Sequence, residues 1–238
     1  MKTLLVTGGS RGIGAGVVRR FSQEGWRVAF GYHQNEQAAQ AVARATGACP
    51  LQADLKQEHQ LSQLYGAALR QLSHLDALIV NAGMAWSGLL QDMPTRAWDD
   101  LMALNLRSAF LLSRLAIPGM VARGSGSILY ISSIHGVHGA SCEAAYAASK
   151  AGLIGLAQSL AAELGPCGIR VNCLAPGVID TDMMAHYSPA DKEALQQQAP
   201  LQRLGTAEDV ADAAFYLCSD EASYITSQVL QIDGGLVL

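Results

Sequence analysis

The sequence is poor in charged and aromatic residues and has no long apolar run. Of its 238 residues, 15% are charged and 6% are aromatic, and the formal net charge is −4. Lys and Arg are scattered along the chain, so no basic stripe indicates binding to nucleic acid. No apolar run approaches the length that crosses a bilayer, and the apolar stretch at the start is too short for a signal peptide. These absences predict no nucleic-acid partner and no membrane partner.

Cysteine is also sparse, and its spacing is not that of a disulfide framework or a zinc site. The five cysteines are odd in number and contain no C-x-x-C pair. The simplest interpretation is a set of buried or half-buried free thiols in a reducing cytoplasm. The sequence therefore predicts a cytoplasmic protein without disulfides and without a metal site.

Short apolar segments alternate with longer amphipathic ones almost to the end of the chain. The pattern predicts strands at 3–7, 28–32, 50–53, 77–81, 127–132, 170–175 and 228–232. It predicts helices at 14–24, 36–46, 58–72, 96–121, 142–164 and 207–219. Strands that are nearly all apolar and alternate with helices favour right-handed crossovers. We expect one α/β domain over 1–238, a doubly wound, mostly parallel seven-stranded sheet with helices on both faces and ligands at the strand carboxyl ends.

A glycine-rich turn lies between the first predicted strand and the first predicted helix. Gly8, Gly12 and Gly14 occupy this turn. Glycine lets the backbone approach a phosphate with no Cβ in the way, and a helix amino terminus offers free N–H groups and a positive dipole end. A structural turn without ligand is the alternative, but the strand-turn-helix context favours a dinucleotide.

A tyrosine and a lysine share one helix face further along the chain. Tyr146 and Lys150 are four residues apart, and Ser133 precedes the tyrosine by thirteen. A free phenol has a pKa of about 10, and a nearby ammonium favours its phenolate form. Such a group can exchange a proton with a carbonyl or alcohol oxygen. Ser132, beside Ser133, is the alternative strand-end serine.

The order and spacing of the glycine turn, Ser133, Tyr146 and Lys150 resemble those of the short-chain dehydrogenases/reductases. The same pattern includes Asn81-Ala82-Gly83, Asn105 and Pro176-Gly177, and the resemblance covers the whole chain. It implies a Rossmann fold and hydride transfer between a nicotinamide and a carbonyl or alcohol. The catalytic residues that it implies are Asn105, Ser133, Tyr146 and Lys150. Ser133 would hydrogen-bond the substrate oxygen, Lys150 would bind the nicotinamide ribose, and Asn105 would hold a water that links Lys150 to solvent.

The resemblance also implies the cofactor-binding residues, and the sequence favours NADP(H). No acid precedes Glu36 at the end of the second strand, so a 2′-phosphate meets no repelling carboxylate. Arg11 resembles the arginine that grips this phosphate, and His33 stands where many relatives have another; an ordinary loop histidine is the alternative. Asp54 resembles the residue that reads adenine, with a helix N-cap as the alternative. The full set is Gly8, Ser10, Arg11, Gly12, Ile13, Gly14, His33, Asp54, Leu55, Asn81, Ala82, Gly83, Tyr146, Lys150, Pro176, Gly177, Ile179 and Thr181.

Within this superfamily the chain looks most like the 3-oxoacyl-acyl-carrier-protein reductases of fatty acid biosynthesis, which implies a 3-oxoacyl thioester substrate. It departs from them where basic residues dock the acidic carrier, because Arg123 stands one position early and Cys167 replaces an arginine. Segments 132–136 and 139–143 are similar to reductases of the 5-aminopentanone group on elongation factor P, our second interpretation. A non-catalytic NADP-binding sensor or scaffold is the third, although such chains typically lose the tyrosine or the lysine.

Two further expectations follow from the resemblance. Segment 177–205, with Met183, Met184, His186 and Tyr187, would be a lid over the nicotinamide; a fixed surface insertion is the alternative. The two long helices would pair across a dimer axis, and the last strand would join dimers, giving a homotetramer or homodimer. The substrate would be a small, carrier-bound or protein-bound ketone.

Overall fold

The computed structural model describes residues 1–185 and 187–236 of the chain. Its strands form one seven-stranded sheet in the order β3-β2-β1-β4-β5-β6-β7, with every neighbouring pair parallel. The strands are β1 Thr3–Thr7, β2 Arg27–Tyr32, β3 Cys49–Gln52, β4 Ala77–Val80, β5 Gly126–Ile131, β6 Ile169–Pro176 and β7 Val229–Ile232. The predicted doubly wound sheet is confirmed, and the pairing is entirely parallel.

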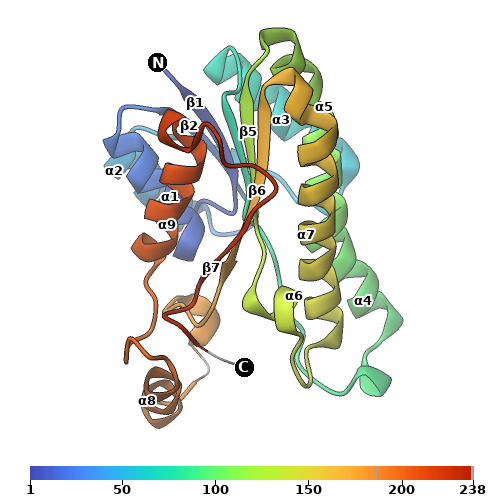
Figure 1. Ribbon diagram of the computed structural model, residues 1–238, viewed down its shortest axis with the longest axis vertical. Coiled ribbons are helices and arrows are strands. Elements are labelled where there is room, and N and C mark those ends of the chain that lie inside the picture. Colours follow the sequence, from blue (N-terminus) through green and yellow to red (C-terminus); the bar gives the residue numbers. More distant parts are fainter. Residues whose placement is uncertain (186, 237–238) are drawn as a thin grey trace.

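Helices cover both faces of this sheet (Figure 1). The α-helices are α1 Gly12–Gln23, α2 Glu36–Thr46, α3 Glu58–Leu72, α4 Thr95–Met102, α5 Ser108–Arg123, α6 Ile134–His138, α7 Ala144–Leu164, α8 Pro189–Gln198 and α9 Ala207–Cys218. Helices α1, α2 and α9 lie on one face, and α3, α5 and α7 lie on the other (Figure 1). Helices α6 and α8 lie beyond the carboxyl ends of the strands, where the glycine turn also lies.

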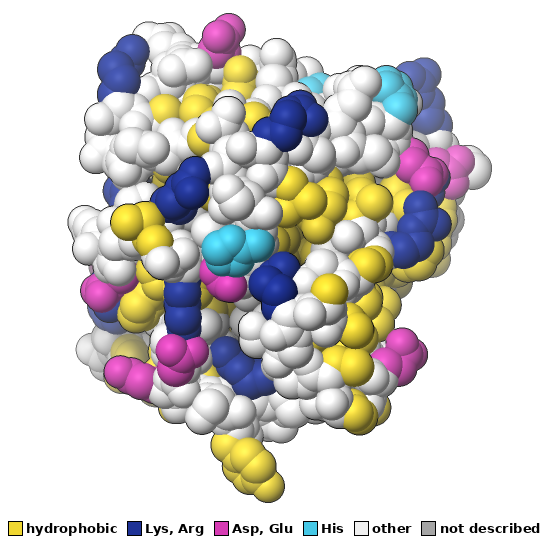
Figure 2. Space-filling view, turned by 90° about the horizontal axis from the view of Figure 1, so that it is seen from above, with side chains coloured by type: hydrophobic (Ala, Val, Ile, Leu, Met, Phe, Trp, Pro, Cys, Tyr) yellow, Lys and Arg dark blue, Asp and Glu magenta, His cyan; other side chains and the backbone are white. Residues whose placement is uncertain are grey.

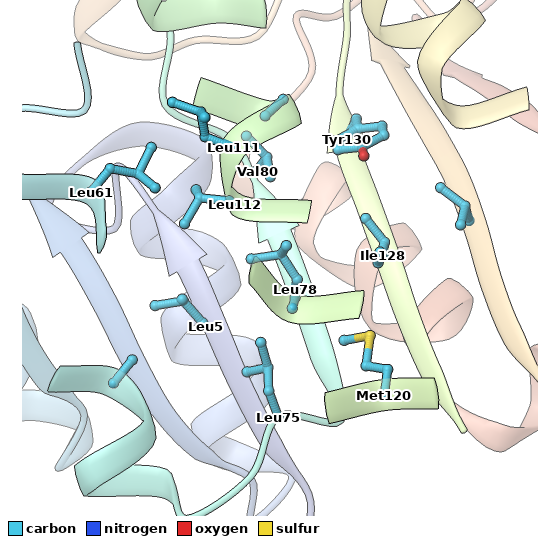
Figure 3. Packing of buried hydrophobic residues seen from close by; sticks show 14 of the residues in the cluster. Leu5, Leu61, Leu75, Leu78, Val80, Leu111, Leu112, Met120, Ile128 and Tyr130 are labelled. Carbon is cyan, nitrogen blue, oxygen red and sulfur yellow. The ribbon is translucent and has the colours of Figure 1, made fainter. Parts of the chain in front are cut away.

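Apolar side chains from both faces of the strands fill two cores, one under each helical layer. In the core under α5, Leu78 and Ile128 from neighbouring strands face Leu112 and Met120 (Figure 3). Tyr130 is fully buried there, and its hydroxyl is 2.6 Å from that of Ser113. This pairing matters because a buried hydroxyl without a partner costs about 1–3 kcal/mol. Because helices cover both faces of the strands, residues on both faces are apolar, and the strand sequences are nearly continuous apolar runs.

Segment 95–123 differs from the sequence prediction in two ways. A single helix was predicted, but five residues of π-helix, Ala103–Arg107, join α4 to α5. By length and composition alone, the whole helix Thr95–Arg123 could cross a membrane. It was not found from the sequence because charged and polar residues interrupt its apolar residues. Its inward residues, including Leu111 and Ala116, belong to the core beside the sheet. We therefore interpret it as a helix that packs one side against the sheet.

The other helix and strand bounds agree with the predictions to within two residues, but two short helices were not predicted. Helix α6 has only five residues, too few for a visible periodicity. Helix α8 lies inside the expected lid and is mostly polar, so it shows no apolar stripe. Its capping box, in which Ser188 and Asp191 bond each other's backbone N–H, is a sequence signal that would have located its start.

Charged side chains of both signs are interspersed on the face that Figure 2 shows, which carries the amino ends of the strands. Hydrophobic side chains gather toward the right of that view, on the side where α5 and α7 lie. All five cysteines are free thiols, and four are buried or half-buried as predicted, but Cys142 is exposed. Among the described residues, no group of three or more His, Cys, Asp or Glu side chains is arranged to hold a metal ion.

Candidate active site

The glycine turn has a left-handed backbone conformation that favours glycine. Gly8 and Gly12 have φ angles of 71° and 52°. A Cβ on Gly14 would lie 2.1 Å from the Gly8 carbonyl oxygen, so no larger residue fits there. Helix α1 begins at Gly12, and the N–H groups of its first turn have no intrahelical acceptor. Ser10 and Ile13 flank the turn half-buried, and Arg11 is exposed at the N-cap.

The loop after β4 is clamped to the end of β1 beside this turn. The Thr7 hydroxyl accepts hydrogen bonds from the N–H groups of Asn81 and Ala82, both at 3.0 Å. Asn81 Nδ2 donates to the carbonyls of Thr7 and Gly8 at 2.9 and 3.4 Å. Asn81 and Ala82 therefore stabilise the junction between β1 and β4, and through it the shape of the glycine turn.

Tyr146 and Ser133 meet at the end of β5. Their hydroxyl groups are hydrogen-bonded, and the Ser133 hydroxyl also accepts from the N–H of His135, which caps α6. Burial raises the pKa of Tyr146 to about 12, although the bond from Ser133 opposes this shift. This differs from the expectation that the neighbouring ammonium favours a phenolate. The phenol is held neutral here, as a proton donor requires.

Lys150 lies one helical turn beyond Tyr146 and is 4% exposed. Its Nζ donates to the Ile131 carbonyl at 2.8 Å and lies 5.6 Å from the centroid of the Tyr146 ring. Burial lowers the pKa of Lys150 to about 8. The ammonium is thus aimed at the strand end, which is why its effect on the phenol is weaker than sequence spacing suggested.

Asn105 lies in the π-helical segment between α4 and α5 and is buried. Its Oδ1 accepts from the Met84 N–H and its Nδ2 donates to the Met84 carbonyl, both at 2.9 Å. Nδ2 also donates to the Ser149 hydroxyl at 3.0 Å, and that hydroxyl donates to the Tyr146 carbonyl at 2.7 Å. The side chain thus ties the loop after β4 to the helix that carries Tyr146. π-Helical turns are common at functional sites.

Gly83 separates Asn105 from Lys150. A Cβ on Gly83 would lie 3.3 Å from both Asn105 Oδ1 and Lys150 Nζ. Glycine therefore keeps the space in front of the buried ammonium open. A lysine ammonium and a helix start with free N–H groups suit a dinucleotide, because its ribose hydroxyls need a donor and its pyrophosphate needs free N–H groups.

The segment after β6 passes over the glycine turn. Pro176 ends β6, and Gly177 packs against Asp233, where a Cβ would lie 2.8 Å from Asp233 Cβ. Ile179 is buried in the core under α1. A Cβ on Gly12 would lie 3.4 Å from Thr181 Cγ2, so the start of segment 177–205 faces the turn.

Segment 177–205 leaves the sheet and returns to it at one place. An isolated parallel bridge joins Ile179 and Gly205, with the Asp180 N–H donating to the Gly205 carbonyl at 2.8 Å. Between these points lie the 3-10 helix Asp182–Met184 and α8. Met184 is buried, whereas Met183 and Tyr187 are exposed. His186, which we assigned to the lid, lies outside the described residues.

The residues predicted to bind the adenine end lie at the ends of β2 and β3. His33 is exposed, and its carbonyl accepts from Gln52 Nε2 at 3.0 Å. Asp54 accepts from the Lys56 N–H at 3.0 Å and so caps a local turn; the N-cap of α3 is Gln57. The Leu55 side chain is buried in the core, which leaves only its backbone for a ligand.

Sequence reasoning missed several groups that surround Tyr146. The Ile131 and Met84 backbone groups carry no sequence signal, because any residue supplies them. Ser149 lies inside the Y-x-x-x-K motif, at a position that the motif leaves unspecified. His135 stacks edge-on against Tyr146 with ring centroids 6.3 Å apart.

Comparison with known proteins agrees with this geometry. A family model described as Enoyl-(Acyl carrier protein) reductase matches residues 8–237. Uncharacterized oxidoreductase YmfI of Bacillus subtilis (strain 168) is 37% identical over 240 residues, which cover 98% of each chain. A 3-oxoacyl-acyl-carrier-protein reductase FabG of Staphylococcus aureus (strain Mu50) is 37% identical over 242 residues, covering 100% of this chain and 98% of the relative. The FabG of Chlamydia muridarum is 39% identical over 240 residues, covering 99% and 97%.

Both the family model and these relatives span nearly the whole chain, at identities well above the level at which fold alone is shared. The carboxyl edge of the sheet brings together the glycine turn, Ser133, Tyr146 and Lys150. The chain therefore belongs to the short-chain dehydrogenases/reductases, oxidoreductases that act on CH–OH or C=O groups with a nicotinamide cofactor.

Proposed function

We propose that this protein reduces a ketone to a secondary alcohol with NADPH. One observation carries the proposal: the half-buried phenol of Tyr146, kept neutral by its raised pKa, is hydrogen-bonded to Ser133, one helical turn from the buried Lys150. An acid with a raised pKa gives up its proton only to a strong base, and the alkoxide that forms during carbonyl reduction is one. The arrangement also speaks against a non-catalytic scaffold, which needs no such proton donor.

The residues divide the chemistry as follows. When bound, the reduced nicotinamide supplies the hydride that attacks the carbonyl carbon. Ser133 donates a hydrogen bond to the substrate oxygen, and Tyr146 gives this oxygen its proton, so that C=O becomes CH–OH. Lys150 binds the ribose hydroxyls, and its positive charge favours return of a proton to the phenol. Asn105 holds Met84 and Ser149, and with them the loop after β4 and the start of helix α7.

NADP(H) is the proposed cofactor because of the charges at the adenine end. Arg11 is exposed at the start of α1, where a 2′-phosphate can reach it. Its nearest carboxylate is Asp182, 3.9 Å away, and both side chains are 69% exposed. Such a pair is weak, so a phosphate can displace the carboxylate. A Michaelis constant for NADH below that for NADPH would contradict this proposal.

A 3-oxoacyl thioester is the substrate that the relatives favour, since two of them are named for that reaction. Docking of an acidic carrier has less support. Arg123 donates to the carbonyls of Gly119 and Leu75, so the arginine nearest to the expected docking position is engaged within the chain. The thioester could therefore be carried by a group other than a protein.

One observation favours the second candidate, the aminoketone on elongation factor P. The Glu143 carboxylate is 2.8 Å from His135 Nδ1, and its charge contributes to raising the pKa of Tyr146, so it lies close to the phenol. A carboxylate at this place attracts an ammonium-bearing substrate and repels an acidic one.

An NADPH-oxidation screen tests these proposals. The substrates are acetoacetyl thioesters on coenzyme A and on acyl carrier protein, small neutral ketones, and elongation factor P bearing the aminoketone. Glu143→Gln separates the two candidate substrates. It alters the Tyr146 pKa for every substrate, but it should weaken the reaction of the aminoketone far more than that of a neutral ketone. Lack of NADPH consumption with every substrate would overturn the proposed function.

A further inference from the structure

The end of β5 holds the Tyr146–Lys150 turn of α7 at three points. The Ile131 carbonyl accepts from Lys150 Nζ at 2.8 Å. The next residue, Ser132, donates its hydroxyl to the main-chain carbonyl of Lys150 at 2.9 Å. Ser133 follows and is hydrogen-bonded to the Tyr146 hydroxyl. Three consecutive residues therefore hold both functional groups and the main-chain carbonyl of Lys150.

The bond from Ser132 is additional to what a helix needs. A carbonyl inside an α-helix already accepts from the N–H four residues later. Lys150 lies well within α7, so the serine hydroxyl does not complete the helix. Its effect is to tie the helix to the strand end at this one residue. Ser132 is itself fixed, because its N–H donates to the Leu174 carbonyl at 2.7 Å.

Helix α6 closes around this bond. A Cβ on Gly136 would lie 2.8 Å from both Ser132 Oγ and the carbonyl carbon of Lys150. The Ser132 side chain is 3% exposed. Strand β5, α6 and α7 thus meet at one hydrogen bond, which leaves the Lys150 backbone little freedom to shift.

We propose that Ser132 is a positioning residue that acts through Lys150: its hydroxyl fixes where the lysine leaves α7, and thereby where the ammonium meets the cofactor. The inference rests on the proposed function, in which Lys150 binds the nicotinamide ribose. Displacement of a reacting or binding group by about 1 Å can lower a rate about 10²-fold. Removal of the Ser132 hydroxyl should therefore weaken cofactor binding and turnover, without unfolding the protein.

A double-mutant cycle tests this inference with NADPH binding as the readout, followed by fluorescence, so that no ketone is needed. Ser132→Ala should raise the Kd for NADPH about fivefold, whereas in the Lys150→Ala background it should change the Kd less than about twofold. A merely structural role would give the same fold-change in both backgrounds, and that result would overturn the inference.

Ser127 provides a matched control. It lies at the other end of β5, is also 3% exposed, and donates to a helix carbonyl, that of Leu217, at 3.5 Å. Ser127→Ala should lower the melting temperature to a similar extent but leave the Kd unchanged. Ser132→Cys has a similar shape but is a weaker hydrogen-bond donor, so it should raise the Kd less than Ser132→Ala and again only when Lys150 is present. It replaces Ser132→Ala in the cycle if that variant does not fold.

The outcomes separate the two proposals. Wild-type protein that does not bind NADPH would overturn the proposed cofactor. Wild-type protein that binds NADPH, together with additive effects of Ser132→Ala and Lys150→Ala, would overturn the positioning role alone.

Discussion

At the scale of single residues, burial has opposite effects on the two groups of the Y-x-x-x-K motif. It raises the pKa of Tyr146 to about 12 and lowers that of Lys150 to about 8. In each case burial disfavours the charged form, which is phenolate for tyrosine and ammonium for lysine. Near neutral pH the site therefore presents a neutral acid beside a cation that is close to losing its charge. Both states suit reduction of a carbonyl better than oxidation of an alcohol.

Tyr146→Phe removes the proposed proton and keeps the ring. We expect it to lower kcat at least about 10²-fold, since general acid catalysis contributes about 10²–10⁴-fold. The Kd for NADPH should change little, because the ring still packs beside His135. Steady-state kinetics and fluorescence titration measure the two quantities. Near-full turnover by the variant would refute the role of Tyr146.

The lowered pKa of Lys150 predicts a pH dependence of cofactor capture. The ammonium is present below pH of about 8 and is lost above it, so the proposed donor to the ribose weakens as the pH rises. We expect kcat/KM for NADPH, which reports ionisations of the free enzyme, to fall between pH 7 and pH 9.5. Lys150→Arg keeps its charge throughout this range, so its profile should be lower but flat. A flat wild-type profile would contradict the prediction.

Residue types could be predicted from the sequence, but their partners could not. The motif placed Ser133, Tyr146 and Lys150 near one another, and the structure brings them together. That Lys150 Nζ donates to a backbone carbonyl, and that Ser132 holds the lysine backbone, depend on the distance between β5 and α7. Sequence spacing carries no information about that distance.

At the scale of elements, the proposed cofactor site depends on the helix start at the glycine turn. Gly14→Ala should abolish measurable NADPH binding, because its Cβ would lie 2.1 Å from the Gly8 carbonyl oxygen and must displace the turn. Gly66→Ala, within α3, is the control: its Cβ would contact only the flexible end of Arg70 at 3.6 Å. The control should bind NADPH normally and gain about 0.5–1 kcal/mol in urea unfolding. Normal binding by Gly14→Ala would show that the turn does not hold the cofactor.

Elements with strong periodicity could be predicted, and those shaped by side-chain bonds could not. Helices α2 and α3 have the predicted bounds, because amphipathic spacing defines them locally. The π-helical segment around Asn105 does not follow from periodicity. It coincides with an asparagine amide that bonds both backbone groups of Met84, twenty-one residues earlier in the chain.

At the scale of the whole molecule, the helix Thr95–Arg123 is apolar, yet only 44% of its most apolar stretch of 18 residues is buried within the chain. Its exposed side includes Phe110 and Val121, which are 46% and 41% exposed. It lies beside α7, on the flank where hydrophobic side chains gather in Figure 2. Exposed apolar surface of this kind marks an interaction site. We propose that a second copy of the chain covers it, as the predicted homodimer or homotetramer requires.

Phe110→Glu tests this assembly. The carboxylate would stand in the middle of the proposed interface, where an unpaired buried charge is strongly unfavourable, so the variant should form smaller particles than the wild type. Arg114, which lies 5.2 Å over the Phe110 ring, can pair with the new carboxylate in the monomer, so the fold itself should tolerate the change. Gln37→Glu on α2, across the sheet from α5, adds the same charge and should leave the mass unchanged. Light scattering measures all three proteins, and a monomeric mass for the wild type would contradict the prediction.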